Sequence, residues 1–112
     1  HLIHSPAGVF APVQIELQAE SVQGVELAAA VGIGPVGTQQ LVVVVTGASL
    51  ASAVVADATL AAAVRAAVTI DVAAVLVAPK IPVDRRHNSK IDRSSVQRWA
   101  DAVLQGARPP RL

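Results

Sequence analysis

Most side chains that could take part in catalysis or ligand binding lie in one segment, residues 82–93, which we call the polar segment. Its sequence is Pro-Val-Asp-Arg-Arg-His-Asn-Ser-Lys-Ile-Asp-Arg, so four cations, two carboxylates, one histidine and one amide occupy twelve positions. A lysine flanked by small polar residues can bind a phosphate or a carboxylate, because its ammonium is a compact charge on a flexible stem. Lys90 is therefore the first candidate for a functional residue.

The rest of the chain is the material of an aliphatic core. Its 112 residues fit one small domain, and 53% hydrophobic against 15% charged residues indicates a folded chain. With one Phe, one Trp and no Tyr, a surface that stacks nucleic-acid bases is not expected. We therefore expect no nucleic-acid partner.

The sequence shows no signal for a membrane or for secretion, so cytoplasm is the default compartment. The chain has no cysteine, which excludes disulfides and thiolate zinc sites. The longest purely apolar run, around residues 41–45, is far shorter than the roughly 20 residues that span a bilayer. The first residues lack the basic and apolar regions of a signal peptide. We expect a cytoplasmic protein with no membrane span.

The charge is unevenly distributed. Residues 1–78 carry five carboxylates against one arginine, a net charge of −4, whereas residues 79–112 carry eight cations against three carboxylates, a net charge of +5. A basic end suits an anionic small ligand, but it is equally typical of a solvated surface. The distribution alone leaves both interpretations open.

Local patterns predict the elements that must position Lys90. The turn signal at residues 5–8 predicts a hairpin within residues 1–11. Val13, Leu17 and Glu20 have helical spacing, which predicts a helix over residues 13–22. An apolar run at residues 27–33 and the valines within residues 39–46 predict two antiparallel strands. The glycines of residues 32–37 lack the spacing of a dinucleotide-binding loop and predict a turn between these strands.

In the second half of the chain, the sequence pattern predicts a helix, a strand, a loop and a last helix, in this order. Alanine-rich residues 49–68 predict a helix, and residues 72–78 a buried strand. The polar segment is then expected to be a loop. Residues 94–105 predict a last helix, with Asp92 or Ser94 as its cap and Trp99 packed in the core. The fold class is α+β: a small single domain with an N-terminal hairpin and about three strands covered by about three helices.

The end of the polar segment resembles the last core motif of adenylate-forming enzymes. Asn88-Ser89-Lys90-Ile91-Asp92-Arg93, preceded by Pro82, is similar to the motif that acyl-CoA synthetases, peptide-synthetase adenylation domains and luciferases share. Residues 8–16 look like the stretch that follows the interdomain hinge of this superfamily. Residues 21–32 look like its next helix-then-strand segment. The resemblance covers almost the whole chain.

This resemblance implies a function for the chain. Residues 1–106 would be the small C-terminal lid domain and residues 107–112 a flexible tail. Lys90 would be the catalytic lysine of adenylation, and Gly8 would lie in the loop after the hinge. ATP and Mg²⁺ would be bound mainly by an N-terminal domain that this chain lacks, and the substrate would be an acyl or amino acid. By itself the chain is then expected to be inactive.

Within this superfamily, Arg86-His87-Asn88-Ser89-Lys90-Ile91 resembles one branch more than the others. The string is similar to the β-lactone synthetases of olefin biosynthesis, which act on 3-hydroxy fatty acids without a CoA step. An acyl-CoA ligase or a peptide-synthetase adenylation domain remains an alternative. A phosphate- or protein-binding module that kept the fold without catalysis is an alternative of another class. Ser89 stands where the superfamily usually has glycine, so the loop lacks a glycine's freedom there.

Each of these residues also has a plain structural interpretation. Without the motif, Lys90 would be a solvated surface charge. Arg86 is expected to hold the loop through Asp84 or Asp92, and contact with a ligand is the alternative. His87 is expected to shape the loop or meet the partner domain, since its spacing to His1 and His4 is not that of a metal site. Asn88 is expected to fix the backbone through side-chain hydrogen bonds.

Overall fold

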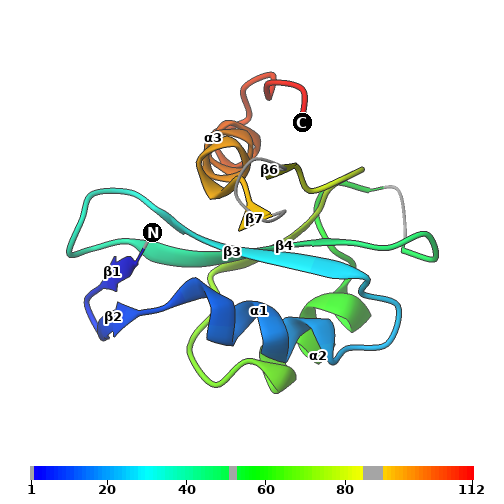
Figure 1. The fold of residues 1–112 in the computed structure, drawn as a ribbon, viewed down its shortest axis with the longest axis horizontal. Helices are drawn as coiled ribbons and strands as arrows, with labels where there is room; N and C mark the ends of the chain where they lie inside the picture. Colours follow the sequence, from blue (N-terminus) through cyan, green and yellow to red (C-terminus); the bar gives the residue numbers. More distant parts are fainter. Residues whose placement is uncertain (1, 51–52, 85–89) are drawn as a thin grey trace.

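The computed structural model describes residues 2–50, 53–84 and 90–112. In this part of the chain the fold is α+β and has three layers (Figure 1). The helices are α1 (Pro12–Glu20), α2 (Ala58–Ala67) and α3 (Arg93–Leu104). The central sheet contains β3 (Leu27–Ile33), β4 (Gln40–Thr46) and β5 (Ala74–Val77) in the order β3-β4-β5. The predicted fold class is confirmed.

The sheet is buried on both faces. In Figure 1, α3 lies above it, and α1 and α2 lie below it. Successive side chains of a strand point to opposite faces. Val42 and Val44 accordingly belong to the cluster on the α3 side, and Val43 and Val45 to the cluster on the side of α1 and α2. A strand covered on both faces reads as a continuous apolar run, which explains the four consecutive valines.

The strands connect in two ways. β3 and β4 are antiparallel, as predicted, with Leu27 opposite Thr46 and Ile33 opposite Gln40. β4 and β5 are parallel, and α2 lies between them in sequence as the crossover. The turn between β3 and β4 is confirmed, and Gly34 and Gly37 adopt positive φ angles of 105° and 96° in it.

α2 is shorter than predicted. The alanine-rich pattern predicts a helix over residues 49–68, but the helix begins at Ala58. Val55 instead bridges to Leu76, and the flanking backbone hydrogen bonds join Val54 to Val77 and Ala56 to Val75. Pairing with the open edge of β5 therefore outweighs the helical propensity of this stretch. Asp57 then caps α2, because its carboxylate accepts a hydrogen bond from the Leu60 N–H at 2.8 Å.

α3 begins and ends close to its predicted limits. Asp92 is the N-cap, which decides between the two predicted candidates. The buried residues of α3 are Val96, Trp99 and Ala100, so the predicted core position of Trp99 is confirmed. Gly106 follows the helix with a φ angle of 72°, and its N–H donates to the Val103 carbonyl.

Two small two-stranded sheets complete the structure. β1 (Ile3–Ser5) and β2 (Gly8–Phe10) form the predicted hairpin. β6 (Val83–Asp84) and β7 (Lys90–Ile91) pair antiparallel, so the prediction of a loop is wrong for these four residues. We call β6 and β7 the ribbon. No helix in the described ranges is long and apolar enough to cross a membrane.

Candidate functional site

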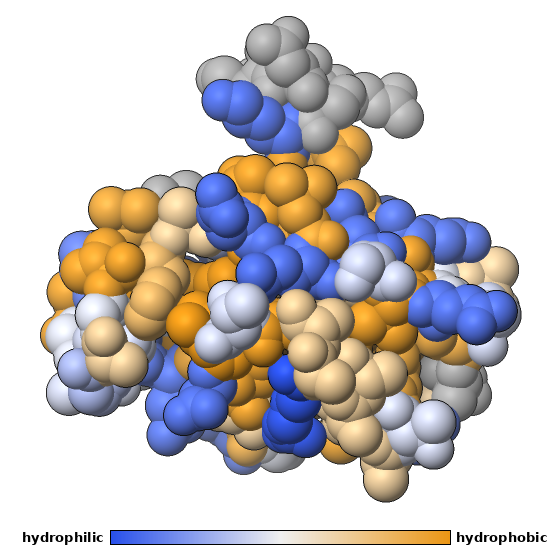
Figure 2. All heavy atoms as spheres, turned by 90° about the horizontal axis from the view of Figure 1, so that it is seen from below, coloured by the Kyte–Doolittle hydropathy of each residue, from blue (hydrophilic) through white to orange (hydrophobic). Residues whose placement is uncertain are grey.

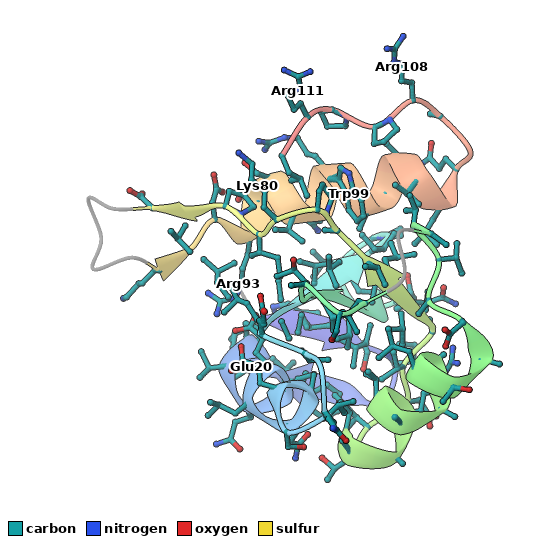
Figure 3. All side chains as sticks on the ribbon, turned by 90° about the vertical axis from the view of Figure 1, so that its right-hand side faces the viewer. Glu20, Lys80, Arg93, Trp99, Arg108 and Arg111 are labelled. Carbon is teal, nitrogen blue, oxygen red and sulfur yellow. The ribbon has the colours of Figure 1, made fainter. Side chains whose placement is uncertain are left out.

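Lys90 lies on the ribbon, at an exposed position. The register pairs Asp84 with Lys90 and Val83 with Ile91. The space-filling view from the side of α1 and α2 shows hydrophilic residues next to hydrophobic ones over the whole of that face (Figure 2). Figure 3 shows the ribbon pointing away from the three-stranded sheet. The ammonium of Lys90 is therefore accessible to an anion that comes from outside the domain.

The residues between the two strands of the ribbon lie outside the described part of the chain. These are residues 85–89, which include Arg86, His87, Asn88 and Ser89. Their predicted roles stay predictions. His1 lies outside the described ranges too, so the metal-site interpretation that combined it with His87 is untested.

The base of the ribbon is joined to α3 by Asp92. The Asp92 N–H donates to the Pro82 carbonyl at 2.9 Å, which closes the ribbon. The Asp92 carboxylate accepts from the Ser95 N–H at 3.2 Å and from the Ser95 hydroxyl at 2.8 Å. These hydrogen bonds from Ser95 lower the pKa of Asp92, and the positive charge of Arg98 adds to the effect. Asp92 is thus held as a carboxylate at the start of α3, where the helix dipole favours negative charge.

The last residue of the motif, Arg93, forms a largely buried ion pair with Glu16. Arg93 Nε donates to Glu16 Oε2 at 2.9 Å and Arg93 Nη2 donates to Glu16 Oε1 at 2.5 Å. The side chains are only 15% and 6% exposed. The two parallel bonds are the fork geometry that guanidinium and carboxylate favour. The hydrogen bonds to Glu16 raise the pKa of Arg93, so the arginine is charged at any working pH.

Sequence reasoning missed this pair. Glu16 and Arg93 are 77 residues apart. The available signal was Glu16 itself, a carboxylate between Ile15 and Ala19 on the helix face that packs inward. A buried carboxylate requires a partner, so its position on this face predicts a cation from another element. It does not predict which cation.

Glu16 also belongs to the edge of the sheet. β3 is an edge strand, and the N–H groups of Ala30 and Ala28 donate to Glu16 Oε2 at 2.9 Å and to Glu20 Oε2 at 3.1 Å. Figure 3 shows Arg93 below the base of the ribbon, on the side where Glu20 lies. Two carboxylates of α1, one helical turn apart, therefore satisfy the open edge of β3, and one of them also binds Arg93.

Gly8 lies in the β1–β2 hairpin with a φ angle of 139°, a region that side chains rarely adopt. Its carbonyl accepts from the Ser5 hydroxyl at 3.0 Å. Gln39 anchors the hairpin, because its Oε1 accepts from the His4 N–H at 2.9 Å. Ile3 of the hairpin belongs to the cluster on the side of α1 and α2, whereas Ile91 of the ribbon packs against the cluster on the α3 side. The structure thus attaches the two predicted site regions to opposite faces of the sheet.

The described residues form no cluster of the kind that binds a metal ion through three or more His, Asp or Glu side chains. Among the described residues, the exposed ammonium of Lys90 can bind an anion. The remaining contacts to such an anion would come from elsewhere.

No protein-family model matches this chain, and no curated protein does. Solved structures do match it. The chain superposes on MatB from Rhodopseudomonas palustris with a TM-score of 0.70 and 14% identity, over 91% of this chain and 20% of MatB. For the amide bond synthetase McbA from Marinactinospora thermotolerans the TM-score is 0.67, with 24% identity over 88% of this chain and 20% of McbA. For a fatty acyl-CoA synthetase from Mycobacterium tuberculosis it is 0.67, with 16% identity over 91% and 20%.

These identities are low, so the likeness concerns the fold. The chain spans about one fifth of the length of each of the three proteins. The 112 residues therefore have the fold of one part of larger synthetases that include an acyl-CoA synthetase and an amide bond synthetase.

Proposed function

We propose that this chain is the lid domain of an AMP-forming ligase that adenylates a carboxylic acid, and that Lys90 is its adenylation lysine. One observation carries the proposal. An exposed lysine, set in a motif that resembles the last core motif of adenylate-forming enzymes, lies on a ribbon projecting from a domain with the fold of part of such synthetases. ATP use is supported by the ATP-bound structure of MatB, which matches this chain.

The proposed reaction needs a positive charge at the place where two anions meet. A carboxylate oxygen of the substrate attacks the α-phosphorus of ATP, and pyrophosphate leaves. Negative charge develops on the phosphoryl oxygens as the new bond forms. A lysine ammonium that contacts a carboxylate oxygen and a phosphate oxygen at the same time lowers the activation barrier of this attack. It does so by stabilising the negative charge and by orienting the two reactants.

The geometry of the ribbon suits this role. Lys90 is exposed, so a second domain can approach it without displacing the core of this one. The proposed partner is therefore an ATP-binding N-terminal domain that holds the nucleotide, Mg²⁺ and the acid. Lys90 completes the site when the lid closes, and the 112 residues alone are expected to be inactive.

The test is ATP–pyrophosphate exchange by the full-length protein. Lys90→Ala is expected to lower acid-dependent exchange by about 100-fold or more, with ATP binding largely unchanged. Lys80→Ala is the matched control, because Lys80 is the other lysine of the chain and is also exposed. Exchange at the wild-type rate in Lys90→Ala would exclude the catalytic role. It would favour the alternative of a phosphate- or protein-binding module without catalysis.

We propose that the substrate is a 3-hydroxy fatty acid and that the full-length enzyme closes it to a β-lactone. The basis is Arg86-His87-Asn88-Ser89, which resembles the corresponding string of β-lactone synthetases. The runner-up is an acyl-CoA ligase, which the structural match to a fatty acyl-CoA synthetase favours. Incubation of the full-length protein with a 3-hydroxy acid and ATP, with and without CoA, separates the two. A β-lactone formed without CoA is the expected product, and a CoA thioester would exclude this branch.

A further inference from the structure

The segment that carries Lys90 has two kinds of attachment. Asp92 forms one hydrogen bond with Pro82 and two with Ser95, and all three are local, since they join the ribbon to itself and to the first turn of α3. The fork of Arg93 is different, because it reaches Glu16 on α1. Of the described hydrogen bonds of residues 90–93, those to Glu16 are the ones that reach across the sequence to the opposite layer.

Glu16 is itself held in place. Its Oε2 accepts both the Ala30 N–H and Arg93 Nε, each at 2.9 Å. The junction therefore joins three elements: α1 provides the carboxylate, β3 one donor and α3 the other. Because a bidentate pair restricts orientation as well as distance, this junction holds the start of α3 at one position and angle relative to the sheet.

Lys90 is three residues from this junction. An extended chain of three residues spans roughly 10 Å, so a small rotation at Arg93 displaces the Lys90 backbone by ångströms. Displacements of about 1 Å at a catalytic group can cost about 100-fold in rate. The precision with which Lys90 is presented thus depends on how rigidly Arg93 is held.

We propose that Glu16 and Arg93 are positioning residues for Lys90: their buried pair sets the place of the ribbon relative to the body of the domain. The inference rests on the proposed function, since it assigns a task to this pair in the adenylation step. Neither residue contacts the reactants, and both act through Lys90.

The test compares Glu16→Gln with Glu20→Gln in the full-length protein. The two glutamates lie on the same helix, and each accepts a hydrogen bond from the N–H of a β3 alanine. In the described structure only Glu16 also binds Arg93. Glu16→Gln is expected to lower the kcat of ATP–pyrophosphate exchange by about 10- to 100-fold, with the KM for ATP little changed. Glu20→Gln is expected to exchange at the wild-type rate.

A double-mutant cycle with Lys90→Ala separates positioning from a general loss of folded protein. If Glu16 acts through Lys90, Glu16→Gln has no further effect once Lys90 is gone. If Glu16→Gln instead acts by reducing the amount of folded protein, it lowers the exchange rate of Lys90→Ala by the same factor as that of the wild type. Multiplicative losses, or equal rates for Glu16→Gln and Glu20→Gln, overturn the proposal.

Two further measurements keep the test decisive. If Glu16→Gln does not fold, Arg93→Lys takes its place in the cycle, since lysine keeps the charge and loses the bidentate fork. Lys90→Ala alone reports on the proposed function. If it leaves exchange unchanged, the proposed function fails first; if it abolishes exchange while Glu16→Gln and Arg93→Lys do not, only the positioning role fails.

Discussion

Lys90 and Arg93 are cations of the same short motif, and the structure treats them in opposite ways. Lys90 is exposed on a ribbon that points away from the sheet. The Arg93 side chain is 15% exposed, and both of its bonds go to one carboxylate on another layer. The difference shows that a charged motif can contain a group for an external anion and a group for internal anchoring. Charge alone does not predict which of the two is buried, because both side chains are cations of the same motif, residues 88–93.

The largest expected effect is on the free energy of unfolding, which we expect to fall far more when Arg93 is replaced than when Lys90 is replaced. Arg93→Met leaves the Glu16 carboxylate buried without its cation, so we expect a loss of about 3 kcal/mol in the free energy of unfolding. Lys90→Ala removes an exposed side chain and is expected to change it by less than about 0.5 kcal/mol. Urea unfolding of the 112-residue chain, followed by circular dichroism, measures both values.

The reverse order of these two losses would contradict the comparison. It would mean that Lys90 is part of the packed structure and that Arg93 is not. Equal and small losses would mean that the pair with Glu16 contributes no net stability, as some ion pairs do when solvent reaches them. Either result would remove the physical basis for separating an anchoring cation from a reactive one.

The smaller expected effect concerns Asp92, which joins the two regions. Asp92→Ala removes the cap of α3 and is expected to cost about 1 kcal/mol at neutral pH. Asp92→Asn keeps a capping side chain, so its loss at neutral pH is expected to be smaller. The free energy of unfolding of the same 112-residue chain gives both values.

The pH dependence tests why Asp92 has a low pKa. Its pKa is lowered in the folded protein by hydrogen bonds from Ser95, so the ionised carboxylate contributes stability above its ordinary pKa of 3.8. This contribution is lost as the pH falls through the lower pKa of the folded state. The stability difference between wild type and Asp92→Asn should therefore be constant from about pH 7 to 5 and shrink below about pH 4. A difference that grows in acid would show that the cap does not favour the charged form.

Much of the fold was predictable because its signals are local. A short apolar run predicted β3, and a run of valines predicted β4. Helical spacing with Gly106 predicted α3 within one residue at each end. The start of α2 was not predictable from propensity. Residues 54–56 contain alanine and valine in a helical pattern, but the open edge of β5 offers backbone partners that only the assembled sheet provides.

The candidate site divides in the same way. The sequence by itself determined the α+β class, the order of the three helices and of the strands of the central sheet, and the choice of Lys90, because residue type, periodicity and motif spacing are properties of neighbouring positions. Only the tertiary structure decided that Lys90 is exposed on a paired ribbon and that Arg93 is bound by Glu16. The physical reason is distance along the chain: a buried charge is stabilised by whichever opposite charge the packing of layers brings within hydrogen-bond reach, here one that is 77 residues away.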